Sequence, residues 1–527
     1  MKPAAATVTR LLRACAFLCL AAAPLHAAAS ELKLAFSSEV TTVDPHFLAA
    51  QANLALTHHL FEPLVAADAQ SRMVPALAQS WRAVDANTWE FKLRPGVRFH
   101  DGSAFTAEDV VFSLARPLNI KGSPGGFAPY VRAIASVQVV DPLTVRIRTT
   151  RPYGPMLQEL NSVAMVSRRA AANAAPEDFD SGAAAVGTGP FRLVRFARGD
   201  RIELARFDGY WGEKPAWERV TIRMIASEPS RTAALLAGDV DAIETIPPAD
   251  LARLKRNPAY AVSQTPSWRT IHLLVDQKSD VAPGISDAQG KPLARNPYKD
   301  VRVRRALSLA IDRSALADRV MEGMAVPAAN VVGPAILGHD PAQKAAAADP
   351  AAARRLLAEA GYPEGFAMTV AAPNNRYPND EQVAQAVAQM LARVGIKAQV
   401  VTLPFQTYVT KARAGEFSLP LLGWGSSAAD LALRSLALTP SAEKGYGAWN
   451  WGGYTSPKLD AAVEASFAAV DETKRIAAAR AANALAMEDF ALIPLYHQVA
   501  AWAMKRGLEY VPRTDEFTLA QHFRPVK

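Results

Sequence analysis

Alternating hydrophobic and polar positions dominate the first half of the chain. Trp89, Phe91 and Leu93 alternate with polar neighbours, and Val145 and Ile147 repeat the same two-residue period. Successive side chains of a strand point to opposite faces, so this period indicates strands with one buried face. Further strands are predicted at residues 32–36, 191–196, 202–207 and 220–225. The first half is therefore predicted to be mostly β.

After residue 228 the hydrophobic residues follow mostly the spacing of helices. A helix through Leu235 is predicted to end at Gly238, because glycine is favoured just past a helix C-terminus. Further helices are predicted at 301–311, 351–360, 381–394 and, with interruptions, 456–487, and strands at 368–371, 397–403, 493–495 and 499–504. Strands that alternate with helices favour a parallel α/β arrangement in this half.

The first 30 residues differ from the rest of the chain. Basic residues precede an apolar run rich in alanine and leucine, and Ala27-Ala28-Ala29 precede Ser30. This order is typical of a secretory signal peptide, predicted at 1–29, and a buried apolar helix is the alternative. Both cysteines, Cys15 and Cys19, lie in this leader. No later stretch is long and apolar enough to span a bilayer, so we expect a mature protein outside the cytoplasm, without disulfides.

Length and charge narrow the class of protein further. The chain has 527 residues, more than the roughly 250–300 at which single cores stop growing, so two or more lobes are expected. The net charge of +8 comes from 58 basic and 50 acidic residues and is dispersed along the chain. Without a block of lysine and arginine, no nucleic-acid partner is expected.

Four sequence blocks carry a resemblance to a known family. They are Thr88-Trp-Glu-Phe-Lys-Leu-Arg-Pro-Gly-Val-Arg-Phe-His-Asp-Gly-Ser-Ala-Phe-Thr-Ala-Glu-Asp-Val-Val-Phe-Ser113, Val186-Gly-Thr-Gly-Pro-Phe191, Asp300-Val-Arg-Val-Arg-Arg-Ala-Leu-Ser-Leu-Ala-Ile-Asp312 and Gly423-Trp424. In this order they resemble the family 5 extracellular solute-binding proteins of ABC importers, which include dipeptide-, oligopeptide-, nickel- and glutathione-binding members. The resemblance covers essentially the whole mature chain.

The resemblance implies an α/β, two-lobed periplasmic-binding-protein fold of the large, three-subdomain type, with the ligand held in a cleft between the lobes. Lobe I is expected to comprise residues 30–268 and 497–527, with an extra subdomain at about 73–185, and lobe II residues 269–496. The chain is expected to cross between the lobes near 265–272 and to return near 495.

The implied function is the periplasmic capture of a peptide or peptide-like solute for an ABC importer. A ligand that contacts both lobes favours the closed form, and the permease subunits at the inner membrane then receive the solute. No bond is broken, so neither catalytic residues nor a cofactor nor a resident metal is expected. A monomer is what the family resemblance implies.

Charged residues are candidates for holding the two ends of a ligand. In peptide-binding relatives an acid shortly after the Gly-Trp of lobe II pairs with the ligand's amine, and Ser427 stands at that position. Asp430, three residues later, is either the amine partner or a cap of the following helix. Arg376 lies near where dipeptide-binding relatives clamp a carboxylate, which a guanidinium fork suits; the alternative is a solvated loop arginine.

Aromatic and hydroxyl side chains complete the predicted site. Cleft sites are mostly apolar with a few aimed polar groups, although most tryptophans belong to cores. One or two of the candidate tryptophans are expected to touch the ligand, and the threonines could add hydroxyl or backbone contacts from lobe I. The candidates are Trp268, Trp424, Trp449, Trp451, Thr41, Thr42 and Thr188.

Other functions remain as alternatives. A secreted hydrolase is disfavoured, because the chain has no Gly-x-Ser-x-Gly elbow, no His-Glu-x-x-His motif and no cysteine outside the leader. Adjacent His58 and His59 would point about 100° apart on a helix, which suits one metal ion poorly. A nickel ion chelated by a small organic ligand would escape this argument. Peptide, glutathione-like conjugate, opine and nickel complex therefore all stay open as cargo, as does a chaperone-like or sensory use of the fold.

Overall fold

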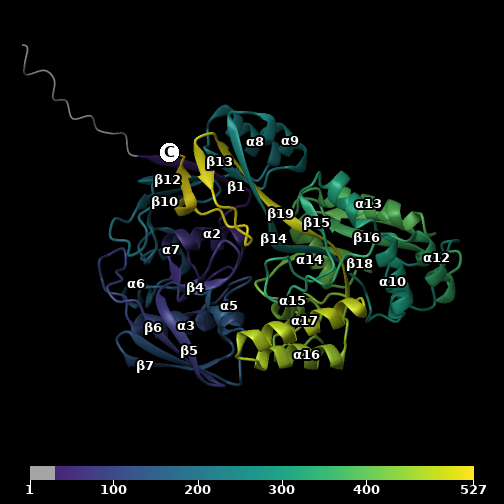
Figure 1. Cartoon of the computed structure of the whole chain (residues 1–527), viewed down its shortest axis with the longest axis horizontal. Coiled ribbons are helices and arrows are strands. Elements are labelled where there is room, and N and C mark those ends of the chain that lie inside the picture. Colours follow the sequence, from purple (N-terminus) through teal and green to yellow (C-terminus); the bar gives the residue numbers. More distant parts are fainter. Residues whose placement is uncertain (1–29, 527) are drawn as a thin grey trace, which may run out of the picture.

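The computed structural model describes residues 30–526, so the predicted signal peptide at 1–29 lies outside the described residues. Over that described range, no helix combines the length and apolar character needed to cross a membrane. Two lobes lie side by side, and two long strands run between them, β14 (Tyr260–Leu274) and β19 (Leu492–Lys505) (Figure 1).

Lobe I is built around the outer half of an 11-stranded sheet. Leu34 and Phe36 of the first strand pack with Leu56 and Leu60 of α2 (Gln51–Leu60) on one face. Helices α8 (Glu228–Ala237) and α9 (Pro248–Arg256) contribute to the core on the other face. The strands, in spatial order, are β10 (Phe191–Ala197), β11 (Arg201–Arg206), β12 (Arg219–Met224), β1 (Glu31–Phe36) and β13 (Ala242–Glu244). The predicted end of α8 is confirmed, because Gly238 adopts φ +81°.

A separate four-stranded antiparallel sheet forms the extra part of lobe I. Trp89 lies opposite Ile147 and Phe91 opposite Val145, so the alternating residues recognised in the sequence share one buried face. The strands are β5 (Ala78–Asp85), β6 (Thr88–Leu93), β8 (Thr144–Thr149) and β7 (Ile134–Asp141), and the helices in this part of the chain include α3 (Ala107–Ala115), α5 (Met156–Leu160) and α6 (Arg168–Ala171). Helix α7 (Pro176–Asp180) packs instead on the main core of lobe I through Phe179.

Lobe II contains the parallel α/β unit that the sequence predicted. Its strands β18 (Leu419–Gly425), β16 (Ala367–Pro373) and β17 (Lys397–Leu403) continue the large sheet, and β16 is parallel to both neighbours. The helices are α10 (Val301–Ala310), α12 (Pro350–Glu359), α13 (Asp380–Ala392), α14 (Phe405–Arg413), α15 (Ala429–Leu436), α16 (Pro457–Ala468) and α17 (Glu472–Glu488).

The strand pair β14 and β19 changes its register where it passes between the lobes. Pro266 pairs with Val499, and pairing then resumes at Thr270 with His497. The sequence predicted two separate terminal strands, but they form one continuous strand, β19, because the whole segment pairs with β14. The expected lobe boundaries at 268 and 497 fall at this irregularity and stay predictions.

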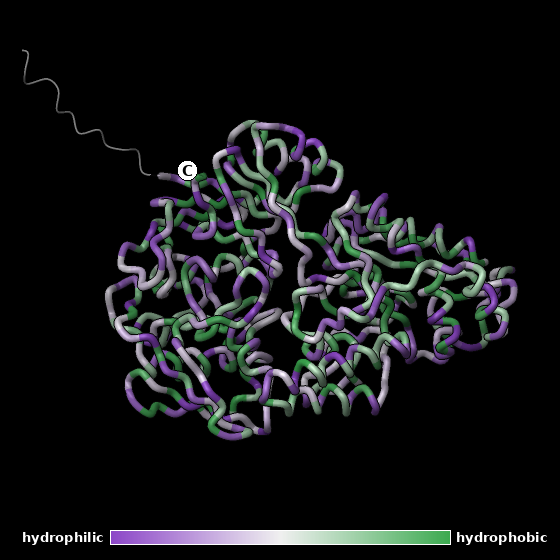
Figure 2. Tube along the Cα trace, in the orientation of Figure 1, coloured by the Kyte–Doolittle hydropathy of each residue, from purple (hydrophilic) through white to green (hydrophobic). Residues whose placement is uncertain are grey.

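The lobes also touch at the side opposite these strands, where α5 lies near α15 and α17 (Figure 1). Leu160 of α5, Leu433 of α15 and Ala482 of α17 belong to one buried hydrophobic cluster. Hydrophobic segments run along the inner strands of both lobes, and many hydrophilic segments lie on outer helices and loops (Figure 2). The space between the lobes is therefore bounded by the strand pair on one side and by this packed contact on the other.

Candidate functional site

The carboxyl ends of three parallel strands meet at one edge of the lobe II sheet. Arg376 follows β16, Phe405 follows β17, and Trp424 to Ser427 form the end of β18 and the loop after it. In open α/β sheets, ligands bind beyond the carboxyl ends of the strands. We call Arg376, Phe405 and residues 424–427 the strand-end site.

Arg376 is the charged centre of this site. Its guanidinium carbon lies 5.4 Å from the centres of both the Tyr377 and the Phe405 rings. Tyr377 is fixed in turn, because its hydroxyl donates a hydrogen bond of 3.1 Å to the Gly423 carbonyl. No described side chain or carbonyl accepts a hydrogen bond from the half-buried guanidinium of Arg376. Burial and the nearby charge of Arg269 lower the pKa of Arg376, and the charges of Glu516 and Asp380 oppose that shift only in part.

Arg269 and Glu516 form an ion pair beside Arg376. Arg269 Nη2 lies 2.7 Å from Glu516 Oε2, and both side chains are largely buried. Gln498 donates a further hydrogen bond of 3.3 Å to Glu516. Glu516 also lines a small cavity of about 30 Å³ between the lobes, together with Pro378. The pair therefore engages Arg269, whereas no described carboxylate forms an ion pair with Arg376.

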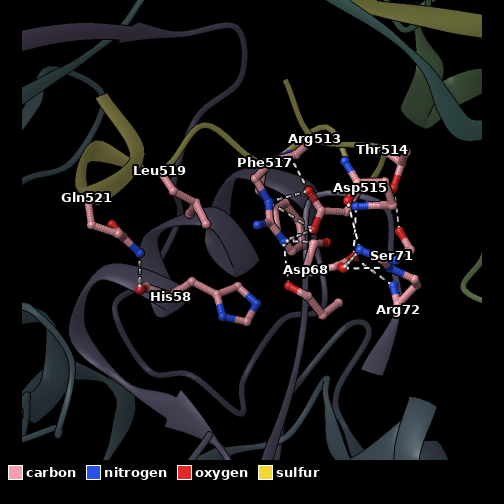
Figure 3. Close-up of polar contacts among 12 residues, drawn as sticks. His58, Asp68, Ser71, Arg72, Arg513, Thr514, Asp515, Phe517, Leu519 and Gln521 are labelled. Carbon is pink, nitrogen blue, oxygen red and sulfur yellow. Dashed lines mark hydrogen bonds and ion pairs between the residues drawn. The ribbon is translucent and has the colours of Figure 1, made fainter. Parts of the chain in front are cut away.

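The C-terminal segment that carries Glu516 is anchored firmly on lobe I (Figure 3). Arg513 Nε donates to Asp515 Oδ1 at 3.0 Å, and its Nη2 donates to the Ala67 carbonyl at 3.0 Å. Gln521 Nε2 donates to the His58 carbonyl at 3.1 Å. These bonds hold the segment that places Glu516 beside Arg269 and packs Phe517 against Trp268.

Three of the predicted tryptophans gather in one aromatic cluster. The ring centres of Trp424 and Trp449 are 5.2 Å apart, and those of Trp449 and Trp451 are 5.4 Å apart. The Arg413 guanidinium lies 4.8 Å above the Trp449 ring and has no carboxylate partner among the described residues. The cluster extends the strand-end site along lobe II with apolar surface and a second unpaired cation.

Trp268 approaches the same place from the strand β14. Its ring packs edge-to-face on Phe517, with 5.9 Å between ring centres. A Cβ at Gly425 would lie 2.7 Å from Trp268 Nε1, so only glycine fits there. The indole nitrogens of Trp268 and Trp451 are buried and donate to no described acceptor. Buried donors are normally paired, but both N–H groups are unsatisfied donors in this structure.

Asp430 has a different environment from the one expected for an amine partner. It is 0% exposed, and its carboxylate accepts hydrogen bonds of 3.0 Å from both Nε and Nη2 of Arg475. Ser466 Oγ donates to it at 2.8 Å. It is not the N-cap residue of α15, which is Ala428, but its Oδ1 accepts the first-turn amide of Leu431 at 2.8 Å. A role of Asp430 in ligand binding stays a prediction, although its carboxylate is already fully engaged.

The arginine that holds Asp430 also crosses to lobe I. Arg475 Nη1 donates to Gln158 Oε1 at 2.5 Å, and Arg434 Nη1 lies 2.6 Å from Glu159 Oε1. Both lobe I residues are on α5, whereas both arginines are on lobe II. We call Gln158, Glu159, Asp430, Arg434 and Arg475 the interlobe ion-pair network.

The three predicted threonines lie within lobe I. Thr42 Oγ1 donates to Asp180 at 2.9 Å, and Thr41 Oγ1 accepts a hydrogen bond of 3.3 Å from Asn53. Thr188 is 0% exposed, in a loop that packs against the end of α2. Ser427, by contrast, is half-buried at the strand-end site and its hydroxyl has no described partner. The ligand contacts of all four residues stay predictions.

A larger cavity, of about 500 Å³, lies away from this site between α3 and α7 of lobe I. The arginine in its wall, Arg116, is already paired with Asp44 at 2.6 Å. Alanine side chains form much of the remaining lining. The strand-end site is therefore the better candidate, because its charges are not satisfied internally.

No metal site accompanies the strand-end site. Within residues 30–526, histidine, cysteine, aspartate and glutamate side chains form no group of three that could hold a metal ion. His59 uses Nδ1 to bond the Ala55 carbonyl at 2.7 Å, and its Nε2 accepts a hydrogen bond from the Ala520 amide at 2.9 Å. The adjacent histidines thus have packing roles.

Sequence reasoning missed Arg269, Glu516 and Phe405. Arg269 and Glu516 are 247 residues apart in the sequence, and no local sequence pattern predicts an ion pair over such a separation. Phe405 was detectable in principle, because it follows a predicted strand at the edge where Arg376 follows another.

Two lobes joined by crossing strands, with the strand ends of one facing the other, define the class of two-lobed solute-binding proteins. A structure of that class, the ABC transporter-associated periplasmic binding protein DppA from Helicobacter pylori in complex with the peptide STSA, is similar with a TM-score of 0.77. It is 22% identical and covers 94% of this chain and 98% of its own. This likeness shows the fold.

Sequence comparison narrows the class to a family. Residues 72–443 match the family described as bacterial extracellular solute-binding proteins, family 5. A dipeptide-binding protein of Escherichia coli (strain K12) is 30% identical over 382 residues, which cover 67% of this chain and 68% of that protein. The glutathione-binding protein GsiB of Shigella dysenteriae serotype 1 (strain Sd197) is 32% identical over 402 residues, covering 75% and 72%. The chain belongs to the bacterial extracellular solute-binding proteins of family 5.

Proposed function

We propose that this protein is the periplasmic substrate-binding component of an ABC importer and that it captures a peptide or peptide-like solute between its lobes. The observation that carries the proposal is the unpaired guanidinium of Arg376 at the carboxyl ends of the lobe II strands. Family membership and the names of the similar proteins support the peptide-like class of solute.

In this proposal Arg376 binds a carboxylate of the solute. A guanidinium offers two parallel N–H donors that match the two oxygens of a carboxylate. The aromatic cluster of Trp424, Trp449 and Trp451 covers the apolar part of the solute. Trp268 and Phe517 cover it from the other side, and the indole N–H of Trp268 donates to a carbonyl or carboxylate oxygen.

Closure follows from the placement of these groups on two lobes. A solute that touches the strand-end site and Phe517 together binds the closed form better than the open form, and this difference shifts the population toward closure. The importer's permease then distinguishes loaded from empty protein. No step requires a catalytic residue, a cofactor or a resident metal.

The remaining parts of the proposal concern location and organisation. The leader at 1–29 directs export to the periplasm and is removed. Residues 30–268 and 497–527 form lobe I, with its subdomain at about 73–185, and 269–496 form lobe II. The mature protein acts as a monomer.

A thermal-shift screen of the mature protein, unfolded and refolded to remove any bound solute, tests the proposal. The panel contains dipeptides, tripeptides, glutathione, opines and nickel–histidine complexes. A ligand at about 100 times its Kd stabilises by roughly 2.7 kcal/mol, a shift of a few degrees. A shift with peptide-like acids supports the proposal. A shift with nickel complexes alone, or with no member of the panel, contradicts it.

A further inference from the structure

We infer that the strand-end site is built for a peptide-like solute that has a carboxylate but no free ammonium group, such as an N-acylated amino acid or dipeptide. This inference rests on the proposed function and names the class of solute more narrowly. It follows from how the charges around Arg376 are paired.

The carboxylates near Arg376 are already engaged. Glu516 accepts hydrogen bonds from Arg269 Nε and Nη2 and from Gln498. Asp380 accepts three backbone N–H bonds, from Arg376 at 3.0 Å, Tyr377 at 3.1 Å and Glu381 at 3.0 Å. A ligand ammonium at either carboxylate would compete with these donors, and it would also lie beside the like charges of Arg269 and Arg376.

The carboxylate that lies closest in sequence to the strand end is also unavailable. Asp430 accepts hydrogen bonds from Arg475 and Ser466. A ligand ammonium that displaced Arg475 from Asp430 would leave the buried charge of Arg475 without a partner. The residue that does lie at the strand end, Ser427, has a neutral hydroxyl. The polar group offered there can bond a carbonyl or an amide but cannot neutralise an ammonium.

The aromatic faces offer no replacement for a carboxylate. Cations bind over aromatic rings, but Arg376 already lies over Tyr377 and Phe405, and Arg413 lies over Trp449. A third cation there would lie beside the half-buried guanidinium of Arg376 and the exposed guanidinium of Arg413, neither of which forms an ion pair with a described carboxylate. The electrostatic balance of the site thus favours an anion over a zwitterion.

The unpaired polar groups of the site are mostly donors. They are the guanidinium groups of Arg376 and Arg413 and the buried indole N–H groups of Trp268 and Trp451. An acylated amino acid supplies the matching acceptors, namely one carboxylate and the carbonyl oxygen of its acyl group. A free ammonium supplies three more donors and no acceptor.

Affinity selection with three matched libraries tests the inference. The libraries are the Ala-Xaa dipeptides, the same dipeptides with N-acetyl groups, and the N-acetyl dipeptides as C-terminal amides, each offered to the refolded mature protein and read by mass spectrometry and calorimetry. We expect the best N-acetyl acid to bind at least as tightly as its free-amine counterpart and at least 30-fold more tightly than its amide.

A gain-of-function variant sharpens the test. Ser427→Asp places a carboxylate at a half-buried position whose hydroxyl has no described partner, and Ser427→Asn is the uncharged control of similar shape. We expect Ser427→Asp, but not Ser427→Asn, to shift the preference at least tenfold toward free-amine dipeptides.

The outcomes separate this inference from the proposed function. If free-amine dipeptides bind the natural protein tenfold or more tightly than their N-acetyl forms, the inference is wrong and the proposed function stands. If no library contains a binder, the peptide-like function itself is contradicted. If Ser427→Asp leaves the preference unchanged although N-acetyl acids bind, the amine end of the ligand lies elsewhere and the inference is again overturned.

Discussion

Two groups of charged side chains lie between the lobes, and they differ in how completely they are paired. In the interlobe ion-pair network, Arg475 makes two 3.0 Å bonds to Asp430 and one of 2.5 Å to Gln158. At the strand-end site, the guanidinium of Arg376 lies over two aromatic rings and donates no hydrogen bond to any described carboxylate. Charged groups whose hydrogen bonds are all made within the protein stabilise one arrangement of the chain. A guanidinium without a protein acceptor can instead bind an acceptor of the ligand.

The amino-acid sequence does not distinguish Arg376 from Arg475, but their surroundings in the structure differ. Arg376 lies in the loop before α13 and Arg475 in the first turn of α17, and neither stands in a conspicuous motif. Their roles differ because α17 brings Arg475 against Asp430, while the loop after β16 brings Arg376 against no carboxylate. Four substitutions or conditions test the comparison, from the largest expected effect to the smallest.

The largest effect is expected at Arg475. Arg475→Met leaves Asp430 as an uncompensated buried charge, and breaking such a pair costs about 3–5 kcal/mol of unfolding free energy. Urea unfolding followed by circular dichroism measures this loss. The matched control is the double variant Arg475→Met/Asp430→Leu, which removes both charges and is expected to recover most of the loss. A single variant as stable as the natural protein would show that the network is dispensable.

A smaller effect is expected at the lobe contact itself. Glu159→Gln keeps the shape of the side chain but removes the charge that lies 2.6 Å from Arg434. Burial raises the pKa of Glu159, although the Arg434 charge opposes that shift. Weakening this pair should favour the open form and cost about 1–3 kcal/mol. Small-angle scattering of the ligand-free protein should show a larger radius of gyration than in the natural protein, and an unchanged radius would argue against a role in closure.

Buried histidines predict how stability depends on pH. Burial lowers the pKa of His58 to about 3, and the Arg513 charge adds to the effect. The folded protein therefore keeps His58 neutral, whereas the unfolded chain takes up a proton below about pH 6.5. Stability is lost as the pH falls from 6.5 toward 3, by on the order of 2 kcal/mol at pH 5 for this residue.

The substitution His58→Leu isolates this contribution. His58 lies 5.2 Å from Phe517, ring centre to ring centre, so an apolar side chain suits its surroundings. The difference in unfolding free energy between pH 7 and pH 5 should shrink by about 2 kcal/mol in the variant. An identical pH dependence in both proteins would mean that His58 is protonated in the folded state.

The smallest effect is expected at the aromatic cluster. Trp449→Leu keeps an apolar side chain but removes the ring that faces Trp424 and Arg413. Aromatic contacts of this kind contribute about 0.5–1.5 kcal/mol, so affinity for the best ligand should fall by about twofold to tenfold. Calorimetry measures the change, and an affinity that rises or stays constant would place the ligand away from the cluster.

Local patterns predicted the secondary structure well, because alternation and capping act over a few residues. The strand through Trp89 and the end of α8 at Gly238 both follow from such short-range rules. These short-range rules do not predict which side chains from distant parts of the chain meet in space. Asp430 looked available in sequence, and only the packing of α15 against α17 assigns it to Arg475.

The same limit applies to the residues that the sequence analysis overlooked. Glu516 reaches Arg269 because the C-terminal segment folds back on lobe I through Arg513 and Gln521. Arg376 stays a prediction as a ligand residue, and its place in the loop after β16, at a sheet edge that favours ligands, agrees with that prediction. The sequence could not predict that Arg376 has no carboxylate partner, because this depends on where the surrounding carboxylates lie in the folded chain.

The most direct test of the account is a paired measurement on Arg376→Met. Without ligand, its unfolding free energy should match that of the natural protein within about 0.5 kcal/mol or exceed it, because an unpaired buried charge has been removed. With the acid that gives the largest thermal shift, its affinity should fall at least 30-fold, about 2 kcal/mol. A variant that loses 3–5 kcal/mol of stability, as expected for Arg475→Met, and still binds that acid normally would contradict the assignment of Arg376 to the ligand.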